Sequence, residues 1–212
     1  MRTGLLGGTF DPIHLGHIDV ALAAERALSL DTVWLVPARV PPHRSDTAAS
    51  PEHRFAMASL ATEGHPSLEV SSLDMEHVGP SYTHESLDRL EAQGVDLSMV
   101  FFITGADAFT LITTWRGFPA ILDRCHFVVV SRGGVAASDL PERVPTLSDR
   151  MRQTPCEVGK QPSIFLVDAR TAAVSSTDVR RRSAAGESID QLVPPAVATY
   201  IREHHLYERS TD

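Results

Sequence analysis

Residues 7–17 read GGTFDPIHLGH, and this stretch indicates the fold class. The apolar run Thr3–Leu6 before it has the length and character of a buried parallel strand. After the turn at Asp11-Pro12, apolar residues recur at helical spacing, which predicts a helix over Leu15–Leu30. A strand, a diglycine turn and a helix in this order are typical of the start of a parallel α/β unit.

The rest of the chain continues the alternation of strands and helices. Short apolar runs predict further strands at Thr32–Val36, Leu68–Ser72, Ser98–Thr104, Phe127–Ser131 and Ile164–Val167. Capping residues and helical periodicity predict helices from Pro51 to about Thr62, between Ser81 and Gly94, over Ser176–Ser183 and over Pro194–His204. We therefore expect a doubly wound parallel α/β sheet.

The domain organisation follows from length and pattern. We expect one domain over residues 1–212, with the sheet core in 1–170 and a small C-terminal helical extension in 171–212. The segment Gly133–Gln161 is rich in Pro, Ser and Arg and shows the least pattern. We interpret it as variable surface.

The composition limits the classes of function. Twenty-seven acidic and nineteen basic residues leave a net charge of −8, which argues against broad binding to nucleic acid. Eighteen of the basic residues are Arg, and the single lysine, Lys160, lies outside any P-loop pattern. Cys125 and Cys156 form no disulfide framework, and no apolar stretch is long enough for a membrane helix or a signal peptide. We therefore expect a cytoplasmic protein.

The stretch 7–17 also indicates chemistry. Glycines let a backbone approach a ligand closely, and the start of a helix offers free N–H groups and a partial positive charge, so the combination suits phosphate. His14 and His17 are three residues apart and should project from one face of the first helical turn. Gly16 between them leaves room for a bulky group.

Two other interpretations of the histidines remain. A tight turn that carries surface histidines is the plain structural one. A metal site is the other, because His43, His84 or Asp107 are available as further ligands. The spacing of these residues forms no compact ligand pattern, so phosphate is favoured over metal.

A second group of polar residues lies near the end of the chain. Ser175, Ser176 and Thr177 precede a predicted helix, and Arg180 follows in its first turn. The hydroxyl groups fit a capped helix start, and together with the guanidinium they fit a phosphate site equally well.

Three further segments carry groups that suit a ligand. Pro41-Pro42-His43-Arg44 is a basic loop, and Tyr82 and Thr83 stand at a predicted helix start. Asp107 follows the strongest predicted strand, at the edge where ligands of open α/β sheets bind, so its carboxylate suits a ribose hydroxyl. Trp115 suits stacking on a flat ring or an ordinary place in the core.

These motifs, taken in order, resemble the nucleotidyltransferase superfamily with the His-x-Gly-His signature, whose members move a nucleoside monophosphate from a triphosphate. Residues 7–17 are most similar to the bacterial nicotinate-mononucleotide adenylyltransferases. The Ser-Ser-Thr-x-x-Arg string at 175–180 resembles the superfamily's second nucleotide-binding signature. Residues 81–83 and 105–107, with Trp115, resemble further family motifs, whereas Arg44 stands where the family's Pro-Pro-His-Lys loop has lysine.

The resemblance implies a Rossmann-like nucleotidyltransferase fold and a reaction. ATP and nicotinate mononucleotide would give deamido-NAD and pyrophosphate, with Mg²⁺ held by the ATP phosphates and no metal site of the protein's own. Neither nucleic acid nor a membrane is an expected partner, and homo-oligomerisation stays open. The alternatives are an adenylyltransferase for nicotinamide mononucleotide or pantetheine phosphate, and a nucleotide-binding regulator with a decayed site.

The resemblance also implies the roles of individual residues. The catalytic residues are expected to be His14, His17 and Arg180. ATP binding is expected from Gly7, Gly8, Thr9, Phe10, His14, Gly16, His17, Gly105, Asp107, Ser175, Ser176, Thr177 and Arg180. The mononucleotide is expected to contact Thr9, Phe10, Arg44, Tyr82, Thr83 and Trp115, with the pyridine carboxylate on the backbone of Tyr82 and Thr83.

Overall fold

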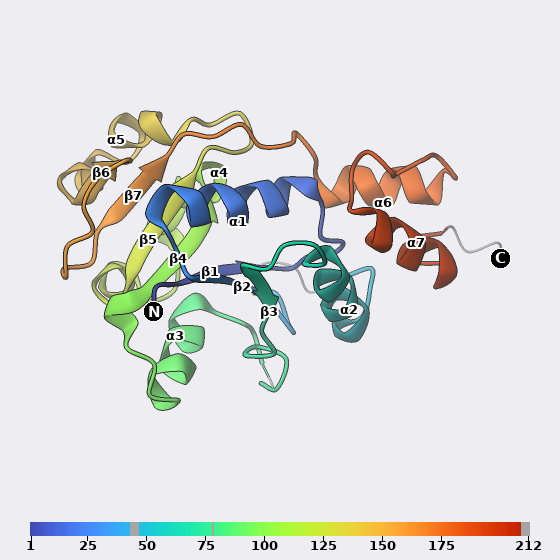
Figure 1. Ribbon diagram of the computed structural model, residues 1–212, viewed down its shortest axis with the longest axis horizontal. Helices are drawn as coiled ribbons and strands as arrows, with labels where there is room; N and C mark the ends of the chain where they lie inside the picture. The colour runs from blue at the N-terminus through green and yellow to red at the C-terminus, as the bar shows by residue number, and fades with distance from the viewer. Residues whose placement is uncertain (43–46, 78, 209–212) are drawn as a thin grey trace.

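The computed structural model describes residues 1–42, 47–77 and 79–208. At its centre is a parallel seven-stranded sheet of order β3-β2-β1-β4-β5-β7-β6 (Figure 1). The strands are β1 Thr3–Gly8, β2 Thr32–Pro37, β3 Leu68–Val70, β4 Val100–Gly105, β5 His126–Val130, β6 Met151–Gln153 and β7 Ile164–Val167. The chain builds outward from β1 in one direction, then returns to β4 and builds in the other, which confirms the doubly wound sheet.

Helices cover both faces of the sheet. Figure 1 shows α1 on one face and α3 on the other, with α6 and α7 beyond the end of α1. The α-helices are α1 Leu15–Leu28, α2 Pro51–Ala61, α3 Thr83–Ala92, α4 Ala106–Phe109, α5 Leu140–Arg143, α6 Ser176–Ala184 and α7 Pro195–Glu203. Short 3-10 turns lie at Leu97–Met99, Ile112–Thr114, Ala120–Asp123, Ala137–Asp139 and Pro145–Arg150. None of the helices in the described ranges is long and apolar enough to span a membrane.

Successive residues of each central strand enter different cores. In β5, Val128 and Val130 belong to the core that also contains apolar residues of α1, α2 and α7, whereas Phe127 and Val129 belong to the core that contains apolar residues of α3 and α4. All of these strand residues are fully buried. A strand covered on both faces must be apolar throughout, which is why these runs show no alternation of polar and apolar residues.

Three predicted elements are too long by two residues: α1 ends at Leu28, β3 ends at Val70, and β4 begins at Val100 after a 3-10 turn. The structure differs from the sequence-based prediction more clearly at two other places. Strand β1 does not stop at Leu6 but continues through Gly7 and Gly8, which pair with Val36 and Pro37 of β2. The interpretation of Gly133–Gln161 as surface is wrong in part, because the segment contains α5, two 3-10 turns and the edge strand β6. Its pieces are too short to show periodicity, and only tertiary packing buries apolar side chains such as Leu140.

A buried guanidinium ties together the loops at the carboxyl edge of the sheet. Arg54 of α2 is fully buried, and it donates to the carbonyl oxygens of Thr9 (2.7 Å), Ala38 (2.6 Å), Arg39 (2.9 Å) and Ala49 (3.3 Å). Burial lowers the pKa of Arg54, and the negative charge of Asp11 opposes that shift. The side chain stays charged and joins the ends of β1 and β2 to the segment before α2.

We predict that Arg54→Met destabilises the fold strongly. The substitution keeps much of the volume but leaves four carbonyl groups, those of Ala38 and Ala49 in buried hydrogen bonds, without their donor, so the free energy of unfolding should fall by about 3 kcal/mol or more. Urea denaturation measures this. Arg26→Met, at an exposed position of α1, is the matched control and should change the value by less than about 0.5 kcal/mol. Equal effects of the two substitutions would contradict the role given to Arg54.

Candidate active site

A cavity of about 550 Å³ opens at the carboxyl edge of the sheet. We call it the central cavity. It lies over the ends of β1 and β4 and is also lined by Pro41-Pro42, by residues at the start of α3 and by Ser175–Thr177. The doubly wound order reverses between β1 and β4, and ligands of open α/β sheets bind at such a point.

Two further hollows continue the central cavity on either side. The Arg132 pocket, of about 1060 Å³, lies between residues 131–136 and 168–175 and shares Asp107, Arg132 and Ser175 with it. The Trp115 pocket, of about 330 Å³, shares Pro42, Ser81, Thr83, Ala108 and Trp115 with it. The three hollows thus form one groove with a middle and two ends, which suits two ligands that meet in the middle.

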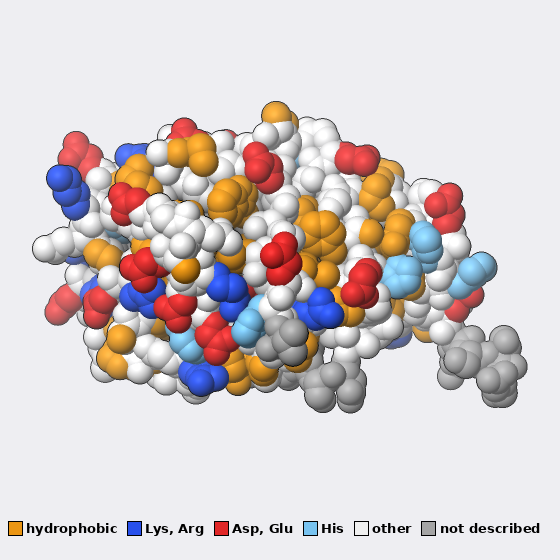
Figure 2. Space-filling model, turned by 90° about the horizontal axis from the view of Figure 1, so that it is seen from below, with side chains coloured by type: hydrophobic (Ala, Val, Ile, Leu, Met, Phe, Trp, Pro, Cys, Tyr) orange, Lys and Arg blue, Asp and Glu red, His pale blue; other side chains and the backbone are white. Residues whose placement is uncertain are grey.

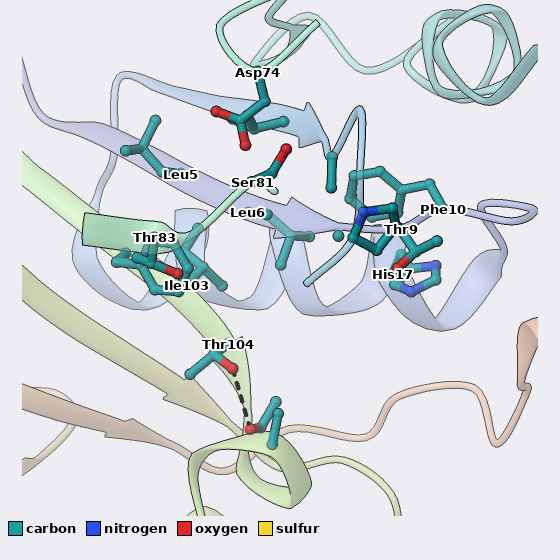
Figure 3. A pocket seen from close by; sticks show the side chains of 18 of the residues that line it. Leu5, Leu6, Thr9, Phe10, His17, Asp74, Ser81, Thr83, Ile103 and Thr104 are labelled. Atoms are coloured by element: carbon teal, nitrogen blue, oxygen red, sulfur yellow. Dashed lines mark hydrogen bonds between the residues drawn. The ribbon is translucent and has the colours of Figure 1, made fainter. Parts of the chain in front are cut away.

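The two histidines of the first motif form a stacked pair. His14 and His17 lie on one face of the first turn, as the spacing of three residues predicts, and their ring centroids are 3.7 Å apart with planes inclined by 26°. His17 lines the central cavity, where its ring lies with Thr9 and Phe10 (Figure 3). His14 is fully buried behind it, and neither of its ring nitrogens has a hydrogen-bond partner in the described part of the chain.

The surroundings of this pair favour neutral rings. Burial lowers the pKa of His14 from 6.5 to about 3, and the positive charge of Arg132 adds to the shift. The pKa of His17 is also well below its ordinary value, because of burial first and then repulsion from His14 and Arg132. The backbone N–H of His14 donates to Nδ1 of His17 (3.2 Å), which leaves the proton of the neutral ring on Nε2 as a donor.

Two glycines of the motif, Gly8 and Gly16, make room for other parts of the protein rather than for a ligand. A Cβ on Gly8 would lie 2.6 Å from the ring of Phe10, and a Cβ on Gly16 would lie 2.8 Å from the carbonyl oxygen of Ala172. The space predicted beside Gly16 for a bulky group is therefore filled by the backbone of Ala172. Asp19 fixes that segment, since its carboxylate accepts from the N–H of Ala172 (2.7 Å).

The two helix starts differ in what they offer an anion. At α1, the N–H of Leu15 already donates to the carbonyl of Leu192 (2.9 Å). At α6, the N–H groups of Ser176 and Thr177 donate to no other described residue, and both residues line the central cavity. The phosphate-binding capacity predicted for both helix starts is thus concentrated at α6.

Arg180 lies beside the cavity and contacts the first motif. Its guanidinium donates to the backbone carbonyl of Asp11 (2.5 Å) and to the hydroxyl of Thr177 (3.4 Å). The Asp11 carboxylate is close as well, with Oδ2 3.9 Å from Nη1 of Arg180. Asp11, in the turn after β1, and Arg180 of α6 are 169 residues apart in the sequence and share one polar site.

The start of α3 faces the Trp115 pocket. Tyr82 and Thr83 line this pocket together with Trp115, and the guanidinium of Arg116 lies 4.8 Å above the Tyr82 ring. The N–H groups of Thr83 and His84 have no acceptor among residues that the structure describes. Trp115 is half-buried and packs edge-on against Phe102, so it belongs partly to the core and partly to the pocket.

Several residues of the groove were not found from the sequence. Arg132 and Asp74 both line the central cavity, and Asp74 is nearly buried. Asp74 accepts from the Ser86 hydroxyl (2.8 Å) and from Arg89 (2.6 Å). Neither residue lies in a recognisable motif. The only signal in the sequence is a charged residue shortly after a predicted strand: Arg132 follows Phe127–Ser131, and Asp74 follows Leu68–Ser72.

Asp107 lies where the sequence places it, after β4. Cβ atoms on Gly105 and Gly133 would collide with its carboxylate, so both glycines make room for it. Its Oδ1 is buried and accepts no hydrogen bond within the described ranges. Such an acceptor lacks a donor that a ligand hydroxyl can supply.

Two sequence-based hypotheses concern residues outside the described ranges. Arg44, expected on the mononucleotide, and His43, a metal-ligand candidate, both lie there. Over residues 1–42, 47–77 and 79–208, no three His, Cys, Asp or Glu side chains are grouped so as to hold a metal ion. The metal alternative therefore has no support from the part of the chain that is described.

Comparison with known proteins identifies the class. Residues 5–182 match the family described as Cytidylyltransferase-like. A "Probable nicotinate-nucleotide adenylyltransferase" of Roseiflexus sp. (strain RS-1) is 43% identical over 208 residues, covering 96% of each chain. The protein of that same name from Pectobacterium atrosepticum is 37% identical, covering 97% of this chain and 98% of its own. The chain belongs to the Cytidylyltransferase-like family and, within it, to the nicotinate-nucleotide adenylyltransferases.

Solved structures share the fold. The nicotinic acid mononucleotide adenylyltransferase of Plasmodium falciparum, in its complex with NaAD, superposes with a TM-score of 0.71 at 18% identity. The alignment covers 97% of this chain and 96% of that one. The Rossmann-like nucleotidyltransferase fold implied by the sequence motifs is thereby confirmed.

We predict that the buried histidine pair makes the fold sensitive to acid. Below pH 6.5 the unfolded chain protonates these rings, whereas the folded protein keeps them neutral until their lowered pKa is reached, about 3 for His14. The unfolded state then binds more protons, so the free energy of unfolding falls with decreasing pH, by on the order of 1 kcal/mol per pH unit for each ring. Urea denaturation at about pH 7.5, 6 and 5 measures the slope.

Two variants serve as controls for this slope. His14→Gln cannot be protonated and should make the dependence on pH shallower. His205→Gln, at a side chain that is 77% exposed, should leave it unchanged. A wild-type slope no steeper than that of His14→Gln would contradict the neutral buried pair.

Proposed function

We propose that this enzyme transfers the adenylyl group of ATP to nicotinate mononucleotide and releases deamido-NAD and pyrophosphate. The observation that carries the proposal is the three-part groove, in which unpaired N–H donors and hydroxyls in the middle separate two pockets. The names of its relatives support the same reaction. The Plasmodium falciparum proteins with this fold were solved with NaAD and with APC, which agrees with it.

In this proposal ATP takes the middle of the groove and the Arg132 pocket. The triphosphate lies against the N–H groups of Ser176 and Thr177, which have no acceptor among the described residues, and against the Thr177 hydroxyl, with Nε2–H of His17 as a further donor. The Ser176 hydroxyl already donates to the carbonyl of Pro12 (2.8 Å). Arg180 and Arg132 supply positive charge, and the unpartnered Oδ1 of Asp107 accepts from a ribose hydroxyl. His14 acts from behind His17 by fixing the ring plane through stacking.

The mononucleotide then takes the Trp115 pocket. Its pyridine ring packs against Trp115, and its carboxylate accepts from the free N–H groups at the start of α3, next to Tyr82. Its phosphate extends toward Thr9 and Phe10 in the middle of the groove, with Arg44 as its proposed basic partner. Both substrates then meet beside His17.

The chemistry requires positioning more than proton transfer. A phosphate monoester has its second pKa near 6, so the attacking oxygen of the mononucleotide is largely ionised at neutral pH. It attacks the α-phosphorus of ATP, and pyrophosphate leaves. The described residues contribute alignment of two anions and hydrogen bonds to the phosphoryl oxygens. We propose that Mg²⁺ enters as part of the ATP substrate and that the reaction takes place in the cytoplasm, where free thiols such as Cys125 and Cys156 persist.

We predict that His17→Ala lowers kcat at least tenfold without unfolding the protein. The substitution removes a donor to the phosphoryl oxygens that is worth over about 1.4 kcal/mol in the transition state. Pyrophosphate release with ATP and nicotinate mononucleotide measures kcat, and circular dichroism checks the fold. His205→Ala, the same change at an exposed histidine, should retain full turnover. A folded His17→Ala enzyme with wild-type kcat would remove His17 from the mechanism.

We also predict a preference for the acid form of the mononucleotide. The N–H groups of Thr83 and His84 suit a carboxylate, whereas an amide places its NH₂ against one donor, a mismatch that costs about 1–3 kcal/mol. The ratio of kcat/KM for nicotinate and nicotinamide mononucleotide measures the preference. Equal use of both forms would contradict the nicotinate-specific assignment, and turnover of neither would leave pantetheine phosphate or a binding role to be tested.

Two variants locate the source of this preference. Trp115→Ala should weaken the binding of both mononucleotides to the same extent, because stacking on the pyridine ring does not distinguish the acid from the amide. Arg44→Ala should do the same, because the phosphate is common to both. A change in the ratio in Arg44→Ala would contradict its proposed place on the phosphate.

A further inference from the structure

The buried carboxylate of Asp11 accepts three hydrogen bonds. Asp11 is only 4% exposed. Its Oδ2 accepts from the N–H of Ala48 (2.8 Å), and its Oδ1 accepts from the N–H of Ala49 (3.1 Å) and from the Tyr207 hydroxyl (2.8 Å). Tyr207 comes from the far end of the chain, 196 residues away.

Arg180 lies within reach of this carboxylate but does not take it as its main partner. The guanidinium donates to the Asp11 backbone carbonyl, while its Nη1 stays 3.9 Å from Oδ2. Arginine and carboxylate normally form short, paired hydrogen bonds, so a carboxylate that is free to rotate would pair with the guanidinium. The three donors on Asp11 fix the carboxylate in an orientation that keeps Oδ2 out of hydrogen-bond distance of Arg180.

The hydroxyl of Tyr207 is a dependable donor. Burial raises the pKa of Tyr207, and the neighbouring charge of Asp11 raises it further, so the phenol stays protonated. The residue has a left-handed backbone with φ of +67°, an unusual conformation for a side chain of this size. The adjoining Leu206 carbonyl accepts from Ser183 Oγ of α6 (3.1 Å), which connects Tyr207 to the helix that carries Arg180.

We propose that Tyr207 is a positioning residue for Arg180. By holding Oδ1 of Asp11, its hydroxyl fixes the orientation of the carboxylate, keeps the guanidinium on the Asp11 carbonyl and leaves the remaining N–H groups of Arg180 directed to the phosphates of ATP. The inference rests on the proposed function, which assigns Arg180 to those phosphates. Removal of the hydroxyl lets the Asp11 carboxylate rotate toward Arg180, and the guanidinium then pairs with it and turns away from the nucleotide.

A purely structural role for Tyr207 predicts a different outcome. The C-terminal segment is also held by Tyr200 of α7, whose hydroxyl bonds to Nδ1 of His53 of α2 (2.9 Å) and does not touch Asp11. Tyr200→Phe is therefore a matched control. It removes one hydroxyl from the same segment and should lower thermal stability about as much as Tyr207→Phe, with no effect through Arg180.

The experiment is a double-mutant cycle on kcat/KM for ATP and for the mononucleotide, measured by pyrophosphate release. Tyr207→Phe should lower kcat/KM for ATP about fivefold or more through a higher KM for ATP, with KM for the mononucleotide within about twofold of wild type. Tyr200→Phe should leave both KM values unchanged. In an Arg180→Ala background, Tyr207→Phe should cause no further loss, because its effect acts through Arg180.

The outcomes separate this inference from the proposed function. Inactive wild-type protein, or wild-type kinetics in Arg180→Ala, would contradict the function or the role of Arg180. With Arg180→Ala impaired, an unchanged KM for ATP in Tyr207→Phe would overturn the inference alone. So would an equal change in Tyr200→Phe, or a loss of the same size in the Arg180→Ala background.

Discussion

Two buried opposite charges at the carboxyl edge of the sheet hold the loops on which the site depends. The Arg54 guanidinium donates to the carbonyls that directly follow β1 and β2. The Asp11 carboxylate accepts from N–H groups of the segment before α2. Ala49 contributes its carbonyl to the first and its N–H to the second, so both charges fix the same segment. Buried charges of this kind are tolerated because their hydrogen bonds are satisfied. Their hydrogen bonds fix the conformation of irregular loops, as backbone hydrogen bonds do in helices and strands.

An acidic protein with a net charge of −8 has to bind anions by local means. Figure 2 shows acidic and basic side chains intermingled over one face of the molecule. Inside the groove the donors are of another kind: backbone N–H groups at α6 and α3 without an acceptor among the described residues, a neutral imidazole and a few arginines. Neutral donors in a sheltered cavity bind phosphate without the self-repulsion that several buried cations would create, and they need little rearrangement as charge develops.

The histidine pair illustrates how packing changes the meaning of a motif. Spacing alone places both rings on one face of α1, and the structure stacks them. Their burial and the nearby Arg132 then lower both pKa values, so they enter as neutral rings rather than as cations. Gly16, interpreted from the sequence as making room for a ligand, instead permits the close approach of Ala172. The first turn of α1 is thereby a packed junction, and the open donors are at α6.

The sequence by itself determined the parallel α/β class, six of the seven described strands, the five longer described α-helices, the place of both histidines on one face of α1 and the capped start of α6 at Ser175. All of these depend on contacts between residues close in the chain, which periodicity and capping chemistry report. Tertiary structure alone decided the strand β6, the buried Arg54, the entry of Arg132 into the groove and the bond between Tyr207 and Asp11. Their partners are distant in sequence and carry no local pattern, so they are chosen only when the packed sheet brings them within hydrogen-bond distance.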